Sequence, residues 1–122
     1  METGFLFPRR ERLKGRDNIR EVFKKKKAFS CPGARLLMSG NGLKYNRIAF
    51  SFPRKYGNAV ERNHSRRLSR EAYRFLRSEL RQGYDLLLLV YSSMDNFHAR
   101  MEQLRALFLK AGLLNITPDS QK

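Results

Sequence analysis

Apolar residues recur along the chain at spacings that predict alternating helices and strands. Ile19, Val22 and Phe23 share one face at helical spacing, which predicts a short first helix from about residue 16 to residue 27. Residues 1–14 have no such period and mix a proline with several basic side chains. We therefore expect an extended basic arm that leads into the folded domain and orders on binding a partner.

Two strands are predicted after the break at residues 31–33, one over residues 35–39 and one over residues 47–52. The Gly-Asn-Gly turn signal between them predicts an antiparallel hairpin. In the second strand, alternation directs one face into the core and leaves the other open to a ligand. The residues of the core face are Ile48, Phe50 and Phe52, and those of the open face are Arg47, Ala49 and Ser51.

A long helix, a buried strand and a last helix complete the pattern. Residues 58–81 contain no Gly or Pro, and Gly83 is a fitting stop signal for a helix there. Residues 84–91 are apolar apart from Asp85, as in a central strand that is covered on both faces. After the capping candidates Ser93 and Asp95, an apolar stripe predicts a helix packed on the sheet, formed by Phe97, Met101, Leu104, Phe108 and Ala111.

The order helix, two or three strands, helix, strand, helix predicts an α+β fold. We expect a two-layer sandwich in the order α-β-β-β-α-β-α, with helices on one face of a small central sheet. The other face, or a cleft between helix and sheet, is then free for a partner. At 122 residues the chain suits one domain, which we assign to residues 15–114 with a C-terminal tail over residues 115–122.

Charge indicates the class of partner. Lys and Arg outnumber Asp and Glu 26 to 11, for a net charge of +15, so a polyanion such as nucleic acid is expected. A merely soluble basic protein is the alternative, but so large a charge repels itself in the compact state. The 41% apolar content separates the chain from disordered basic tails.

Several other classes of protein are disfavoured by composition. The single cysteine, Cys31, excludes an internal disulfide, and the two scattered histidines, His64 and His98, supply no metal-ligand cluster. The apolar run over residues 86–91 is far shorter than the roughly 20 residues that span a bilayer. Residues 1–7 lack the form of a secretory signal. We expect a cytoplasmic protein with no membrane partner.

The functional chemistry is concentrated in residues 54–81. At 100° per residue, one side of the predicted helix is apolar, through Leu68, Ala72, Phe75 and Leu76. The other side carries Arg62, Arg66, Arg70, Arg74, Arg77 and Arg81. Arginine suits phosphate because its planar fork donates two parallel hydrogen bonds and stays charged. A solvated, salt-bridged face is the alternative, but the three acids Glu61, Glu71 and Glu79 cannot neutralise six arginines.

Two helix ends have both a structural and a functional interpretation. Gly57 allows a tight turn and Asn58 is placed to cap the long helix. Beside Arg54, Lys55 and Arg62, the same helix N-terminus favours a phosphate. At the end of the first helix, the run of lysines over residues 24–27 either complements the helix dipole or contacts phosphate directly.

Residues 55–71 resemble the signature of the bacterial ribonuclease P protein family. The match comprises a basic pair, Gly-Asn-Ala-Val, an Arg-Asn box, spaced basic residues and Arg-Glu. It extends to Arg-Leu-Lys at residues 12–14, Val-Phe-Lys at residues 22–24 and Gly-Tyr-Asp at residues 83–85. The resemblance implies a left-handed crossover between parallel strands, against the usual right-handed rule, a layout also found in a ribosomal protein domain.

The resemblance also implies a division of labour. A large RNA would perform Mg²⁺-assisted phosphodiester hydrolysis, and this chain would bind that RNA and the single-stranded 5′ leader of precursor tRNA, one protein to one RNA. Mg²⁺ would be held mainly by the RNA, with no metal and no catalytic side chain in this chain. The residues expected to face the RNA are Arg62, Asn63, Arg66, Arg67, Arg70 and Arg74, and those expected to border the leader are Ile19, Phe23, Ser51, Arg54 and Lys55.

Three positions depart from the family pattern. Ile19 stands where the family usually has an aromatic, so Phe23 can stack a base but Ile19 cannot. His64 replaces an arginine-type residue with a titratable one, and the helical count tilts it toward the core. Pro53 precedes the basic pair and is expected to shift the end of the strand.

Two other functions compete with this interpretation. One is a ribosomal or ribosome-associated binding module with the same layout, because a fold does not fix a function. The other is a protein-only nuclease with His64 or His98 as general base. Such chemistry needs a second positioned group or a two-metal acidic cluster, and the sequence places neither beside these histidines.

Overall fold

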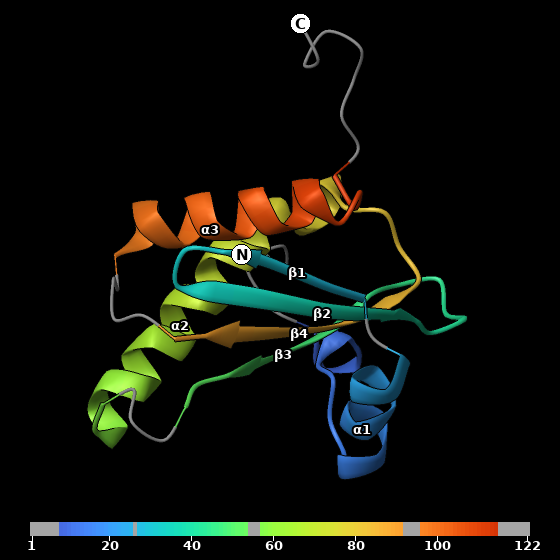
Figure 1. The fold of residues 1–122 in the computed structure, drawn as a ribbon, viewed down its shortest axis with the longest axis horizontal. Coiled ribbons are helices and arrows are strands. Elements are labelled where there is room, and N and C mark those ends of the chain that lie inside the picture. Colours follow the sequence, from blue (N-terminus) through green and yellow to red (C-terminus); the bar gives the residue numbers. More distant parts are fainter. Residues whose placement is uncertain (1–7, 26, 54–56, 92–95, 115–122) are drawn as a thin grey trace, which may run out of the picture.

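The computed structural model describes residues 8–25, 27–53, 57–91 and 96–114. Within these ranges, three helices pack on one four-stranded sheet (Figure 1). The elements are a 3₁₀ turn at Arg9–Glu11, α1 at Arg16–Lys25, β1 at Lys27–Cys31, β2 at Ala34–Gly40, β3 at Arg47–Ser51, α2 at Ala59–Leu76, a 3₁₀ turn at Arg77–Glu79, β4 at Tyr84–Val90 and α3 at Phe97–Lys110. This order confirms the predicted α+β fold class.

The sheet has the strand order β1-β2-β4-β3, so β4 lies centrally, as its apolar sequence predicts. β2 pairs antiparallel with both β1 and β4. β3 pairs parallel with β4, and α2 connects the two strands in the predicted βαβ crossover unit. Asp85, the charged residue of β4, forms a bidentate ion pair with Arg47 on the neighbouring strand, with both N···O distances at 2.8 Å.

The hairpin predicted between residues 35–39 and 47–52 is wrong. β2 instead forms its hairpin with β1, across a turn in which Gly33 has φ +82°. The Gly-Asn-Gly segment belongs to a longer loop that is tied to the start of β4. Asn41 donates its backbone N–H to the Gly83 carbonyl at 2.9 Å, and Asn46 accepts from the Tyr84 N–H at 2.9 Å. The loop therefore carries β3 past β2 to the far side of β4.

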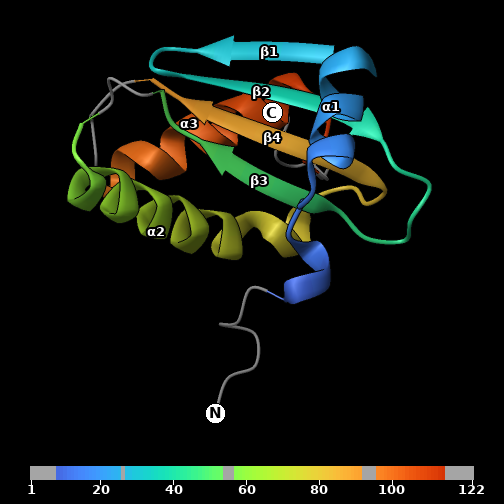
Figure 2. The same ribbon diagram turned by 90° about the horizontal axis from the view of Figure 1, so that it is seen from below.

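Helices cover both faces of the sheet, which corrects the expectation that all of them lie on one face. α2 and α3 lie against one face, where Leu36, Leu86 and Leu88 are fully buried. α1 lies on the opposite face (Figures 1 and 2), where Val22 packs with Leu37 and Leu87. Because side chains alternate along a strand, the apolar run of β4 supplies both cores at once.

α2 is shorter than predicted and is rotated about its axis. Asn58 caps it as predicted, in a reciprocal capping box with Glu61, which was not predicted, and the α-helix ends at Leu76. Its buried face is formed by Ser65, Ser69, Ala72, Tyr73 and Leu76, whereas Phe75 is 55% exposed. His64 is also exposed, contrary to its predicted tilt toward the core.

Arg100 of α3 explains the rotation of α2. Its guanidinium is fully buried and donates from Nη1 to the Ser65 and Ser69 hydroxyls, at 3.1 and 2.5 Å. A buried guanidinium needs polar partners, so these two serines occupy the face that an apolar pattern assigns to leucine and phenylalanine.

α3 follows the predicted stripe for most of its length. Leu104 and Phe108 are fully buried, and Phe97 is 38% exposed at the start of the helix. Asn96 caps α3 by accepting from the Ala99 N–H at 2.8 Å. The predicted caps, Ser93 and Asp95, lie outside the described residues.

The described part of the predicted arm packs against the domain. Leu13 is buried and donates its N–H to the Ile48 carbonyl at 2.8 Å, beside the edge of β3. Glu11 accepts three hydrogen bonds from Arg77, and the Nη2–Oε2 distance is 2.6 Å. Residues 8–14 therefore border the sheet and α2, while the division of the chain into arm, domain and tail stays a prediction.

Candidate nucleic-acid interface

Three arginines line the flank of α2 that faces β3, and we call Arg62, Arg66 and Arg70 the arginine stripe. Arg62 Nη1 donates to the Gly57 carbonyl at 2.5 Å, and Arg66 Nη1 donates to Asn63 Oδ1 at 3.2 Å. The Arg66 guanidinium also lies 5.2 Å from the centroid of the Phe52 ring. In the described parts of the chain, no carboxylate forms an ion pair with these three arginines, so their charge is available to an anion.

A hollow of about 190 Å³ separates the arginine stripe from the N-terminal segment. Its floor is apolar, and its rim carries Arg12, Lys14, Arg66 and Arg70. Partial burial lowers the pKa of Arg70, and the nearby charges of Arg12 and Arg66 lower it further. Cations crowded in this way against an apolar floor create a focused positive potential, which a phosphate group would relieve.

The C-terminal arginines of the predicted stripe have carboxylate partners. Arg74 pairs with Glu71 at 2.9 Å, and only 14% of its side chain is exposed. Arg77 pairs with Glu11, whose side chain is 8% exposed. The pairing of Arg77 with an acid from the N-terminal segment was not predicted, because 66 residues separate the two in sequence.

Asn63 and Arg67 lie one turn apart on the exposed side of α2. Asn63 is exposed and binds the guanidinium of Arg66, so it belongs with the arginine stripe. Arg67 is also exposed but lines a separate hollow of about 210 Å³ with His64, Leu68 and Glu71. At about 100° per residue the six residues expected to contact RNA share one broad arc of α2, and they line more than one hollow.

Ile19, Phe23 and Ser51, three of the residues expected to border the leader, lie on the side of the sheet that α1 covers in part. Ile19 and the 45% exposed Phe23 line a shallow surface hollow with Arg16 and Arg20. Ser51 is half-buried at the end of β3. It points to the same side of the sheet as Ala49, which packs in the cluster under α1. Arg54 and Lys55 lie outside the described residues.

Four basic residues join these surfaces although no site was assigned to them from sequence. Arg12 and Lys14 stand on the rim of the arginine hollow, and Arg16 and Arg20 flank Phe23. Strand-like alternation about Leu13 would have revealed the first two, because burial of Leu13 directs its neighbours outward.

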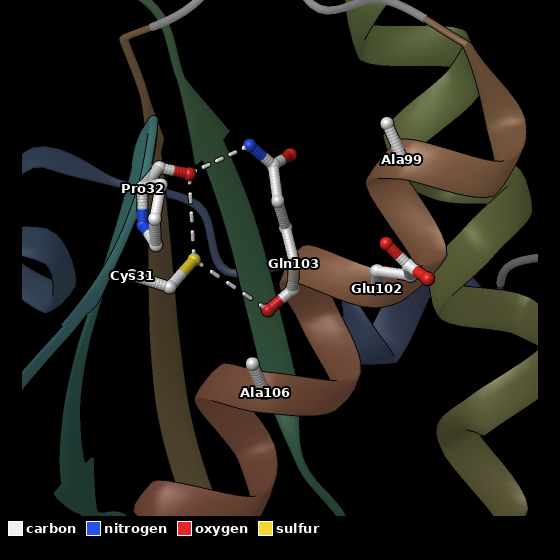
Figure 3. Close-up of a pocket in the computed structure, with 6 residues that line it drawn as sticks. All are labelled: Cys31, Pro32, Ala99, Glu102, Gln103 and Ala106. Atoms are coloured by element: carbon white, nitrogen blue, oxygen red, sulfur yellow. Dashed lines mark hydrogen bonds between the residues drawn. The ribbon is translucent and has the colours of Figure 1, made fainter.

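A further hollow, of about 220 Å³, lies between the end of β1 and α3 (Figure 3). Gln103 bridges it by donating from Nε2 to the Pro32 carbonyl at 3.0 Å. Burial raises the pKa of the Cys31 thiol, which keeps that side chain protonated and a poor nucleophile at neutral pH. The arrangement joins β1 to α3 and offers no reactive group.

The described residues also lack two other features. They contain no group of three or more His, Cys, Asp and Glu side chains arranged to hold a metal ion. In the same ranges, no helix has both the length and the apolar character needed to cross a bilayer.

The fold and the arginine stripe define a class: a small, strongly basic α+β protein with guanidinium groups gathered on one flank of a helix. The Ribonuclease P family model matches residues 7–112, and the chain belongs to that family. The Ribonuclease P protein component of Natranaerobius thermophilus is 36% identical over 104 residues, which cover 84% of this chain and 90% of the relative. That of Dictyoglomus turgidum is 32% identical over 114 residues, or 90% of this chain and 96% of the relative.

Solved structures agree with this assignment. The ribonuclease P protein from Thermotoga maritima superposes with a TM-score of 0.75 at 27% identity, covering 82% of this chain and 96% of that one. The Staphylococcus aureus protein gives a TM-score of 0.78 at 20% identity, over 86% of this chain and 98% of that one, and supports the fold alone.

Proposed function

We propose that this chain is the protein component of ribonuclease P. In this role it binds the catalytic RNA and the 5′ leader of precursor tRNA, and it assists RNA-catalysed removal of the leader. The observation that carries the proposal is the arginine stripe beside β3, free of carboxylate partners among the described residues, in a chain of the ribonuclease P family. The assembly would contain one RNA and one protein, in the cytoplasm.

The RNA would contact the arginine stripe and the hollow beside it. Arg66 and Arg70 stand on one rim of the hollow, and Arg12 and Lys14 come from the N-terminal segment. A phosphate between the two elements would be held by charge-assisted hydrogen bonds from both. Asn63 adds a neutral polar group, and Arg67 and Arg74 add charge on the outer side of α2.

The leader would follow the face that carries Phe23. A single-stranded segment needs cations along its backbone and rings on which its bases stack. Phe23 supplies an exposed ring, Arg16 and Arg20 supply flanking cations, and Ile19 supplies apolar contact without stacking. Ser51 lies on the same face, and Arg54 and Lys55 join this surface on the strength of the family motif.

The chemistry is assigned to the RNA, with Mg²⁺ held mainly there. The side chains described in this chain do not fit a metal-ion site, so no step is assigned to a protein-bound ion. The protein's own contribution is electrostatic: a chain of net charge +15 screens the repulsion between two polyanions.

Reconstitution with a bacterial ribonuclease P RNA tests the function. At low Mg²⁺, where phosphate repulsion is poorly screened, the chain should accelerate cleavage at the mature 5′ end of precursor tRNA. A rate equal to that of RNA alone would contradict the proposal. Cleavage by the chain without added RNA, lost on His64→Ala substitution, would instead indicate a protein nuclease.

Phe23→Leu tests the leader surface. The substitution keeps an apolar side chain but removes the ring, so the affinity gained from the leader should fall about tenfold, within the range for loss of one stacked base. The measurement is the ratio of the dissociation constants for precursor and mature tRNA in the assembled particle. Arg66→Ala is the control: it should weaken binding of the RNA subunit and leave that ratio unchanged. If the wild-type chain binds RNA but precursor and mature tRNA have equal dissociation constants, a ribosomal or ribosome-associated binding module is favoured.

A further inference from the structure

Two aromatic side chains contact each other at the surface where α2 meets α3. Phe75 is 55% exposed and Phe97 is 38% exposed. Their ring centroids lie 5.6 Å apart with an interplanar angle of 73°, an edge-to-face arrangement. We call Phe75 and Phe97 the aromatic pair.

Packing of the core does not account for the exposure of the aromatic pair. Ser65 and Ser69 bind the guanidinium of Arg100 on the buried face of α2. With these serines turned inward, the rotation of α2 about its axis directs Phe75 outward. A single exposed apolar residue is ordinary, but two rings in contact form a rigid apolar surface that water solvates poorly. Such a surface suits a flat apolar partner.

The surroundings of the aromatic pair are cationic. The Arg74 guanidinium lies 5.9 Å from the centroid of the Phe75 ring while it pairs with Glu71. Two turns earlier on α2, the exposed Arg67 lines the hollow beside Leu68. A second copy of this chain is a poor occupant, because two molecules of net charge +15 repel each other. A planar group carried on a polyanion can stack on the two rings while the charge of the polyanion attracts the cations.

We propose that the aromatic pair is a second RNA-contact surface, on which an unpaired base of the partner RNA stacks. Phe75 follows Arg66 by nine residues, so at about 100° per residue the two side chains point to opposite flanks of α2. The RNA therefore contacts α2 on both flanks, through phosphates at the arginine stripe and through a base at the aromatic pair. This inference rests on the proposed function, because it takes ribonuclease P RNA as the partner.

A single-tryptophan variant tests stacking directly. The chain contains no tryptophan, so Phe75→Trp introduces one indole at the proposed contact. Titration with the ribonuclease P RNA of the same organism should quench its fluorescence, because a stacked base contacts the ring. The matched control is Leu109→Trp on α3, at a site of similar exposure, 50%, where no quenching is expected.

Affinity provides the second measurement. Phe75→Leu and Phe97→Leu keep an apolar surface but remove a ring, and each should weaken RNA binding by about five- to a hundredfold, the range for loss of one stacked base. Phe75→Tyr should retain wild-type affinity. Circular dichroism of each variant shows that the fold is kept.

The outcomes separate this inference from the proposed function. If the wild-type chain accelerates cleavage but the Phe75→Trp indole is not quenched and both leucine variants bind normally, the aromatic pair does not contact RNA. If the wild-type chain neither binds nor activates the RNA, the proposed function itself fails. Sedimentation showing a dimer of the free wild-type chain that Phe75→Leu dissociates would identify a second copy as the occupant and overturn the inference.

Discussion

The two halves of α2 both carry arginines, but these arginines differ in their hydrogen-bond and ion-pair partners. In the N-terminal half, the partners that the described residues offer to Arg62 and Arg66 are neutral groups, and Arg70 lines a hollow together with other cations. At the C-terminal end, Arg74 and Arg77 pair with the carboxylates of Glu71 and Glu11. A helical wheel places all five on one broad face, yet the structure divides them.

The comparison shows that the presence of a nearby carboxylate decides whether an arginine stabilises the fold or stays available to a ligand. Glu71 lies on the same helix as Arg74, but Glu11 reaches Arg77 from the N-terminal segment. The Arg77–Glu11 pair fastens the N-terminal segment to the end of α2, whereas arginines without a carboxylate partner keep their positive potential for a ligand. The helix thus combines the arginine stripe with a structural clamp, which we define as the Arg77–Glu11 ion pair.

The largest expected effect comes from breaking the clamp. Arg77→Ala leaves the carboxylate of Glu11 buried without its cation, which should lower the free energy of unfolding by about 3 kcal/mol. Urea denaturation measures this loss. The control is Arg81→Ala, an exposed position just beyond the 3₁₀ turn, where stability should change by less than about 0.5 kcal/mol.

A double variant sharpens the same test. Glu11→Leu combined with Arg77→Met replaces the pair by apolar side chains and should recover most of the lost stability. RNA affinity should stay within about twofold of wild type in both the single and the double variant, measured where the protein is folded. Tenfold weaker RNA binding by Arg77→Ala at unchanged stability would make Arg77 part of the binding surface.

The second largest effect is expected on RNA affinity, at Arg70 in the N-terminal half of α2. Arg70→Ala should weaken binding of ribonuclease P RNA about tenfold and reduce the slope of log K against log salt concentration by about one, because one phosphate contact is lost. Arg74→Ala is the matched control, one turn later on the same helix, and should have a smaller effect since Glu71 already offsets its charge. Equal effects of the two substitutions would show that the ion pair with Glu71 does not distinguish Arg74 from Arg70 in RNA binding.

The sequence predicted the elements of this fold better than their pairing. The central position of β4 followed from its apolar run, and the cap of α2 followed from Asn58 and Gly57. The hairpin failed because Asn41 and Asn46 bind the start of β4, contacts across more than 35 residues that a local turn signal does not contain. The prediction of which face of α2 is buried was wrong because Ser65 and Ser69 bind Arg100, which a helical wheel of α2 alone does not include.

The candidate site was predictable to a similar extent. The motif located Arg62, Asn63, Arg66 and Arg70 on one flank of α2, partly exposed, because helical spacing is a local property. It did not separate Arg74 and Arg77 from them, since that distinction depends on which carboxylates the fold brings near. It also did not reveal the aromatic pair, because Phe75 at helical spacing resembles a core residue until the buried serines are known.

The smallest expected effect concerns His64, an exposed residue of α2. His64 is exposed and lies on the flank of α2 that carries Leu68 and Phe75, away from the arginine stripe. If RNA contacts both flanks, His64→Arg adds a permanent charge beside it and should tighten binding about two- to fivefold at low salt, an effect that added salt screens. Leu109→Arg adds the same charge to α3 and controls for a general gain in electrostatic attraction. An equal gain in both variants would confine local RNA contact to the arginine stripe, whereas a gain at His64 alone would extend it across α2 toward the aromatic pair.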